Sequence, residues 1–489
     1  EPDTLDVHVS PWAVAANVGL NIFDTLVIQD PTDASYKPGL AESWEVAPDG
    51  TSYTFKLRSG VTFHDGTPLD AEALKFNFDR IADPATKSGF AASLLGPYAG
   101  SEVVDPLTVR VTFKEPYAPL LDSLSQAFLG IVSPAAVQKF GTDFGVNPVG
   151  AGPFVFKEWA KQDHLTLVKN PDYTWASPVF AHQGAAYLDE VTFKFIPESA
   201  TRTGTLESGE TALIEAVAES DLEIVQGEGY QLLVGQAPGL PTTLLINTAK
   251  APTDDPAVRR ALIQATDAQE IIDTVFFGAY NRATAPLATV SWAYNPEVAP
   301  VFAFDPEGAA KTLDEAGWTL NGEYREKGGQ RLAIDFFFSA AWDGGTYGEL
   351  WQSQLRKIGI ELTIKQIDVS ARIETAQNGQ TNIVANGWIS SDPIILEHLF
   401  HSKNIGVGYS WTFYKDPQLD QILDQGRAEV DHDKRKALYA QAQQIIADQS
   451  LVVPLADLAS LNGLRASVHD VKIDSRGWYR WLYDAWVEQ

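Results

Sequence analysis

A chain of 489 residues is longer than one hydrophobic core usually supports, so the sequence predicts two or more lobes. Its 36 basic and 64 acidic residues give a net charge of −28, which argues against nucleic acid as a partner because phosphates require a basic surface. Cysteine is absent, which excludes disulfides, thiolate metal sites and cysteine nucleophiles within this sequence.

The first half of the chain carries a clear strand–turn–helix signal. Ser52–Leu57 alternates polar and apolar residues, which predicts a half-buried strand, and Asp49-Gly50 ahead of it predicts a hairpin turn. A second turn is expected at His64–Thr67. Asp70 then occupies an N-cap position ahead of a helix. The apolar face of that helix is expected to carry Leu74, Phe78 and Ile81.

The second half interleaves strand-like and helical segments in the same way, which predicts an α/β fold. No run of eighteen apolar residues occurs, so no transmembrane helix is expected. Strands are expected at Leu244–Asn247, Ile334–Phe338, Ile360–Ile364 and Ile383–Ala385. A second joint between lobes is expected near Val452–Leu455. Helices are expected within Pro256–Phe276, at Gly348–Ile358 and at Asp433–Ala447.

The amino-acid sequence of the segment Ala41–Arg80 closely resembles a signature of family 5 extracytoplasmic solute-binding proteins. These proteins are the dipeptide-, oligopeptide- and nickel-type receptors of ABC importers. Further blocks that resemble this family follow in the same order along the whole chain. They are Asn147–Phe154, Asn170–Tyr173, Arg202–Gly209, Val258–Leu262, Gly387-Trp388 and Leu399–Ser402.

The resemblance implies a two-lobed α/β fold like that of periplasmic binding proteins, with mixed sheets, an inserted subdomain and a ligand cleft between the lobes. Three spatial domains are expected. The first-lobe core would comprise residues 1–32, 156–247 and 462–489, the inserted subdomain residues 33–155, and the second lobe residues 248–461.

The same resemblance implies a receptor that captures a small, peptide-like solute by lobe closure and delivers it to a membrane ABC permease. An oligosaccharide or another polar solute stacked on tryptophan, or a metal chelate, stays open as an alternative ligand, and a chaperone or adhesin is an alternative use of the fold. We expect a monomer at the periplasmic or extracellular face, with any lipid anchor attached through a segment outside this sequence.

Common enzyme motifs are absent from this sequence. There is no Gly-x-Ser-x-Gly elbow, no Walker loop and no His-Glu-x-x-His motif, so we expect no catalysis and no cofactor. The best metal candidate is the pair His398 and His401, three residues apart. Because the resembled family carries the block around His401 whatever its ligand, we expect a structural role for these histidines.

Aromatic residues give the positive signal for binding. Thirteen tryptophans is a high number, and flat rings with a polar edge suit a solute site. The candidate binding residues among them are Trp388, Trp411, Trp12, Trp292 and Trp342. Trp478, Trp481 and Trp486 are expected in the core instead.

Two peptide anchors of the resembled family are missing from the matching positions. Ser391 stands where dipeptide- and oligopeptide-type relatives bind the peptide ammonium with an aspartate, and Asp392 follows it as a possible substitute. The loop after Ile334–Phe338 has no arginine for a peptide carboxylate. Since a buried charge requires a charged partner, both losses argue against a short peptide held by its termini.

Overall fold

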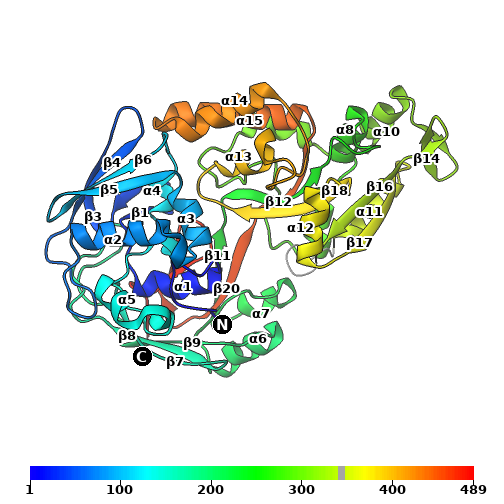
Figure 1. The fold of residues 1–489 in the computed structure, drawn as a ribbon. Helices are drawn as coiled ribbons and strands as arrows, with labels where there is room; N and C mark the ends of the chain where they lie inside the picture. The colour runs from blue at the N-terminus through cyan, green and yellow to red at the C-terminus, as the bar shows by residue number, and fades with distance from the viewer. Residues whose placement is uncertain (340–346, 489) are drawn as a thin grey trace. The chain divides into compact units, whose positions relative to one another are not determined.

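The computed structural model describes residues 1–339 and 347–488. The chain forms two compact units, coloured by residue number in Figure 1. Unit 1 comprises Glu1–Gly235, Ala428–Val430 and Ser460–Gln489, and unit 2 comprises Gln236–Arg427 and Asp431–Ala459. Within the described ranges, no helix combines the length and the apolar character that crossing a bilayer requires.

Unit 1 contains a four-stranded antiparallel sheet in the order β3-β4-β6-β5. The predicted strand Ser52–Leu57 is β4, and the predicted turn joins it to β3 (Ala41–Val46). The predicted cap is also confirmed, because the Asp70 carboxylate accepts a hydrogen bond of 2.9 Å from the Ala73 amide at the start of α2 (Ala71–Ala82). The other strands of this sheet are β5 (Tyr98–Asp105) and β6 (Thr108–Phe113).

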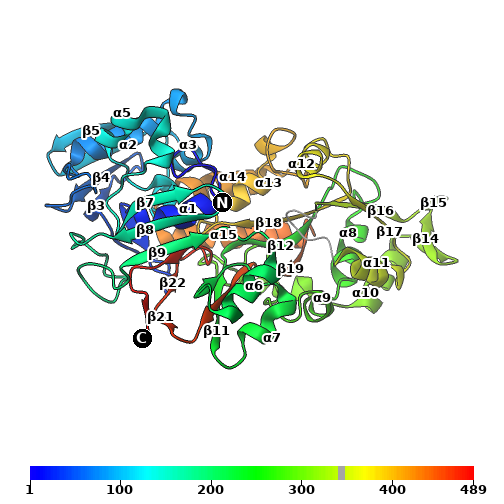
Figure 2. The same ribbon diagram turned by 90° about the horizontal axis from the view of Figure 1, so that it is seen from below.

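Two three-stranded sheets complete the main framework of unit 1, in the orders β7-β8-β9 and β10-β20-β11. Figure 2 shows β7, β8 and β9 as neighbouring strands, with β9 at the edge of its sheet. The strands are β7 (Phe154–Ala160), β8 (His164–Lys169), β9 (Glu190–Lys194), β10 (Leu213–Ile214), β11 (Tyr230–Gln236) and β20 (Ala459–Arg465). The helices that matter below are α1 (Ala13–Ile22) and α6 (Ser199–Ser208).

Unit 2 is built on one mixed five-stranded sheet in the order β17-β16-β18-β12-β19, and Figure 2 labels all of its strands. Strand β16 runs parallel to both of its neighbours, and β12 runs antiparallel to both of its own. The strands are β12 (Gly239–Ile246), β16 (Ala333–Phe338), β17 (Glu361–Gln366), β18 (Ile383–Ile389) and β19 (Val452–Ala456). The main helices are α8 (Pro256–Gln264), α9 (Ala268–Val275), α10 (Pro306–Glu315), α11 (Gly348–Arg356), α12 (Val369–Gln377), α13 (Ile395–Phe400), α14 (Pro417–Ala428) and α15 (His432–Asp448).

Strand β12 differs from its sequence prediction. The sequence placed Leu244–Asn247 at the end of the first-lobe core, whereas the structure begins the strand at Gly239 and pairs it with β18 and β19 inside unit 2. A short apolar run indicates a buried strand but does not indicate which sheet the strand joins, because that depends on distant segments. The division into three spatial domains stays a prediction.

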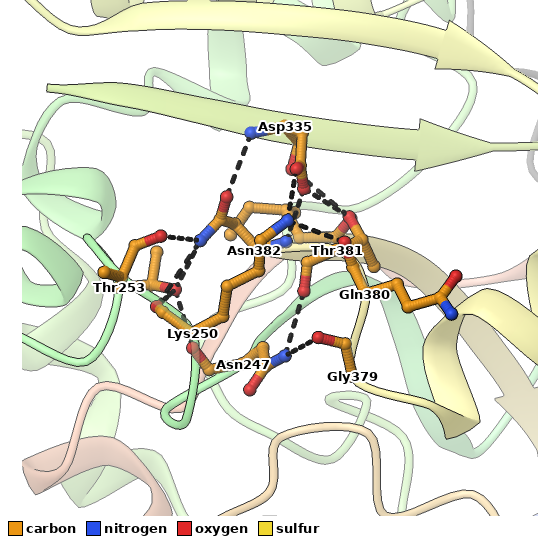
Figure 3. Close-up of polar contacts among 10 residues, drawn as sticks. Asn247, Lys250, Thr253, Asp335, Gly379, Gln380, Thr381 and Asn382 are labelled. Atoms are coloured by element: carbon orange, nitrogen blue, oxygen red, sulfur yellow. Dashed lines mark hydrogen bonds and ion pairs between the residues drawn. The ribbon is translucent and has the colours of Figure 1, made fainter. Parts of the chain in front are cut away.

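A polar network fixes the loop that follows β12 (Figure 3). The Asn382 side chain donates to the Ala251 carbonyl and to the Thr253 hydroxyl, at 3.0 Å each, and accepts from the Asp335 amide at 3.2 Å. Lys250 forms an ion pair with the Asp335 carboxylate. These contacts tie the loop to β16 and to the residue that precedes β18, so hydrogen bonds add to the apolar packing at this end of the sheet.

Candidate functional site

The candidate site lies where β18 extends beyond one of its neighbours. Strand β16 pairs with β18 only at Ile383 and Val384, whereas β12 accompanies β18 as far as Ile389. The sequence predicted an end at Ala385, but pairing with β12 continues the strand, so Trp388 lies within it, opposite Leu240. The end of β18 therefore keeps a strand neighbour on the β12 side only.

Two accessible aromatic rings meet at this end of the sheet. The Trp388 ring is half-buried, and the Tyr409 side chain is exposed. Their centroids are 4.8 Å apart and their planes are nearly perpendicular, an edge-to-face contact that aromatic pairs favour. The exposed His398 ring lies nearly parallel to the Trp388 ring, with centroids 6.2 Å apart. Together these rings present apolar faces with polar edges.

Trp411 lies behind this pair rather than beside it. Its side chain is only 3% exposed, and its centroid is 5.6 Å from that of Tyr409. The indole N–H donates to the Gly408 carbonyl at 3.2 Å, and the Arg372 guanidinium lies 5.5 Å from the ring centroid. Trp411 is a candidate binding residue in the sequence, and in the structure its ring is buried and packs against Tyr409.

Arg372 connects this support to the sheet. It comes from α12 and donates to the carbonyl of Ala385, the first residue of β18 after the last pair with β16. The side chain is 2% exposed, and one of its faces lies against Trp411. Because a buried guanidinium requires acceptors and favours aromatic faces, Arg372 links the position of Trp411 to that of β18.

Asn386 supplies an unused hydrogen-bond donor close to the aromatic rings. It lies two residues before Trp388 in β18, and alternate residues of a strand share a face. Its Oδ1 accepts from the Gly387 amide at 3.0 Å, while its buried Nδ2 has no acceptor among the described residues. A buried amide group normally finds a partner, so this Nδ2 is an unsatisfied donor within the described part of the chain.

Asp392, expected as a substitute ammonium anchor, is already paired. Both of its carboxylate oxygens accept from the Arg435 guanidinium, at 2.5 and 2.7 Å, and its side chain is 2% exposed. One of these oxygens also accepts from the Ile394 amide at 2.8 Å. This arrangement favours a structural role for Asp392. Ser391, its neighbour, is also buried.

Trp292 belongs to the surroundings of the same ion pair. Its half-buried ring has the Arg435 guanidinium 5.7 Å from its centroid and the His432 ring 4.5 Å from it. Trp12 is 55% exposed in unit 1, immediately before α1, and Trp342 lies outside the described residues. Within unit 2, Trp388 and Trp411 both contact Tyr409, whereas Trp292 contacts His432 and Arg435.

The two histidines considered for metal binding face different partners. His398 lies beside Trp388, whereas His401 is buried, with its ring nitrogens 3.3 and 3.4 Å from the carboxylates of Asp420 and Asp424. In the described part of the chain, no group of three or more His, Asp or Glu side chains is arranged to hold a metal ion.

Sequence reasoning missed the contacts that Tyr409, His398 and Arg372 make with the two tryptophans, although it considered His398 as a metal ligand. Tyr409 precedes Ser410 and Trp411 in a loop, and its position beside a candidate tryptophan was an available signal. Arg372 had no such signal, because its contacts with Ala385 and Trp411 depend on how α12 packs.

The buried ion pair yields a test of the role of Asp392. Asp392→Asn should lower the free energy of unfolding by about 3–5 kcal/mol, because Arg435 keeps a buried charge without its counter-charge. Urea unfolding measures this loss, and Asp433→Asn, at an exposed position of α15, is the matched control. If Asp392 binds a solute ammonium instead, the variant would keep its stability and lose solute affinity.

The chain is similar to a known protein family and to characterised relatives. Residues 35–406 match the family model described as bacterial extracellular solute-binding proteins, family 5 middle. The chain is 30% identical to a probable di/tripeptide-binding protein 5 of Pseudomonas aeruginosa, over 97% of this chain and 92% of that protein. It is also 30% identical to the glutathione-binding protein GsiB of Salmonella paratyphi A, over 92% of this chain and 86% of that protein.

Solved structures are similar over the full length of the chain. NikA from Brucella suis in complex with Fe(III)-EDTA has a TM-score of 0.87 and 28% identity, and covers 100% of this chain and 98% of its own. DppA from Helicobacter pylori in complex with the peptide STSA has a TM-score of 0.77 and 26% identity, with coverages of 100% and 96%. The fold is therefore the mixed α/β fold of periplasmic binding proteins, and the chain belongs to family 5 of the bacterial extracellular solute-binding proteins.

Proposed function

We propose that this protein is the receptor of an ABC importer for short peptide-like solutes, with the aromatic cluster of Trp388, Tyr409 and Trp411 as one wall of its binding site. The relatives named above bind di- or tripeptides, glutathione, a tetrapeptide or a metal chelate. The observation that carries the proposal is the accessible pair Trp388 and Tyr409, supported from behind by a buried ring.

The chemistry of this wall suits a peptide. Aromatic faces bind apolar side chains and the flat peptide group with little loss of side-chain entropy. The unused Nδ2 of Asn386 offers a donor to a peptide carbonyl. Polar groups of this kind orient a solute, while the enclosed apolar area supplies most of the binding free energy.

The proposed site does not bind the peptide through ion pairs to both of its termini. Asp392 is committed to Arg435, and Ser391 carries no charge, so neither supplies a counter-charge for a peptide ammonium. We therefore propose that main-chain and aromatic contacts hold the solute, which favours peptides longer than two residues. An oligosaccharide stacked on Trp388 is the second candidate, since a sugar ring uses the same flat surface.

The remaining parts of the proposal concern how the receptor works. It binds its solute by closing two lobes, passes it to a membrane permease without changing it chemically, and acts as a monomer outside the cytoplasmic membrane. The family match and the aromatic cluster, which suits binding rather than catalysis, support this reading.

Variants of the two tryptophans should separate binding from support. Trp388→Ala should weaken solute binding by about 1–3 kcal/mol while the fold survives, because an accessible ring loses stacking area. Trp411→Ala should instead destabilise the fold by about 3–5 kcal/mol, because a large buried ring is removed.

Calorimetry and urea unfolding on the same preparations measure both effects, with glutathione and a tripeptide as the solutes. Tyr324→Ala, in the hairpin formed by β13 (Thr319–Asn321) and β14 (Tyr324–Lys327), is the matched control. A Trp388→Ala variant with unchanged affinity would remove Trp388 from the binding site.

Peptide length supplies the test of the proposed grip. Calorimetric titration should give dipeptides an affinity about tenfold or more below that of tri- and tetrapeptides, because dipeptides offer few main-chain groups and find no charged anchors. Maltotriose serves as the sugar control. Submicromolar binding of ordinary dipeptides would contradict the grip, and binding of maltotriose alone would favour the second candidate.

A further inference from the structure

Unit 1 contains a cavity of about 910 Å³ that shares no residue with the aromatic cluster. All the residues around it belong to unit 1, so it is a feature of that unit alone. A volume in this range holds an organic molecule of drug size. The residues that line the cavity indicate which chemical class of molecule fits it.

The wall of the cavity is mostly apolar. Strand β9 contributes Val191 and Phe193, which are half-buried while their neighbours in the strand are exposed. Helix α1 contributes Val14 and Val18, and the C-terminal segment contributes Leu482. Trp486, which the sequence assigned to the core, is 38% exposed and also lines the cavity.

One carboxylate in the wall is held in place by buried donors. Glu215 Oε1 accepts from Asn17 Nδ2 at 2.6 Å and from Arg480 Nη2 at 2.7 Å, and both donor residues are 5% exposed. Asn17 Oδ1 in turn accepts from the Arg480 amide at 3.1 Å. This arrangement fixes the orientation of the carboxylate, while its Oε2 takes no hydrogen bond from any described residue.

Further charged residues around the cavity are engaged as well, just as Glu215 is paired with Arg480. The Arg202 guanidinium donates to the carbonyls of Ile196, Pro197, Glu215 and Ala216 at 2.8–3.0 Å. Lys194 pairs with Glu210 at 2.7 Å, and Glu190 pairs with Lys157 at 2.7 Å. A molecule entering the cavity would thus meet apolar side chains and, at Glu215, an acceptor oriented for a hydrogen-bond donor.

We propose that this cavity is a second binding site, for a small apolar molecule that carries an amine. The apolar body would lie against Val18, Val191 and Phe193, and the amine N–H would donate to Glu215 Oε2. A carboxylate in the same position would have no N–H to donate to Oε2, and Arg480 already supplies the counter-charge of Glu215. The site is independent of the solute site of the proposed receptor, because it uses none of the same residues.

Fluorescence of N-phenyl-1-naphthylamine, an apolar molecule with one N–H, tests the site on the full chain. The probe should gain fluorescence on binding, and octylamine should displace it about tenfold better than octanoate. Glu215→Gln should abolish this preference, whereas Glu207→Gln, at an exposed position of α6, should keep it.

Blocking variants locate the probe. Val14→Trp and Val487→Trp, at rim positions that are 38% and 45% exposed, should each weaken probe binding about tenfold. Val104→Trp, 48% exposed on β5, is the control, and the melting temperature of each variant verifies folding. Two results would overturn the proposal: no fluorescence gain, or a gain that survives both rim variants and disappears in Trp388→Ala.

Discussion

The accessible aromatic surface of unit 2 depends on how the sheet ends at β18. Val384 is the last residue of β18 that pairs with β16, and β18 continues beyond it. Arg372 from α12 donates a hydrogen bond to the carbonyl of the following residue, Ala385. The same guanidinium packs against Trp411, which in turn lies behind Tyr409. A single buried cation thus links the end of a strand, a helix and an aromatic loop. A binding surface that must keep its shape requires supporting contacts of this kind.

The segment that follows β18 is fixed by a second buried cation. Arg435 holds both oxygens of Asp392 and also donates to the Gly426 carbonyl, so it ties this segment to α14 and α15. A charge pair of this kind is specific in geometry but costly to desolvate, and its loss leaves one charge uncompensated. This pairing leaves both oxygens of the Asp392 carboxylate already hydrogen-bonded to Arg435.

Local sequence patterns were sufficient to predict the elements that depend on contacts between residues close together in the chain. Ser52–Leu57 and the Asp70 cap follow from alternation and from side-chain capping within three residues. The end of β18 did not follow, because Asn386 and Gly387 are weak strand formers and their strand conformation depends on β12. The pairing of Asp392 with Arg435 spans 43 residues, and the burial of Trp411 depends on α12. Contacts between such distant residues produce no periodic pattern in the sequence, so neither could be predicted from it.

Hydrogen exchange with a saturating mixture of tri- and tetrapeptides tests the central claim most directly, because it reports on every segment without altering any residue. The account predicts that bound peptide slows exchange at residues 386–389, at the end of β18, and at residues 408–411, which carry Tyr409 and Trp411. Unchanged exchange in both segments under saturating peptide would contradict the assignment of the aromatic cluster as a wall of the solute site.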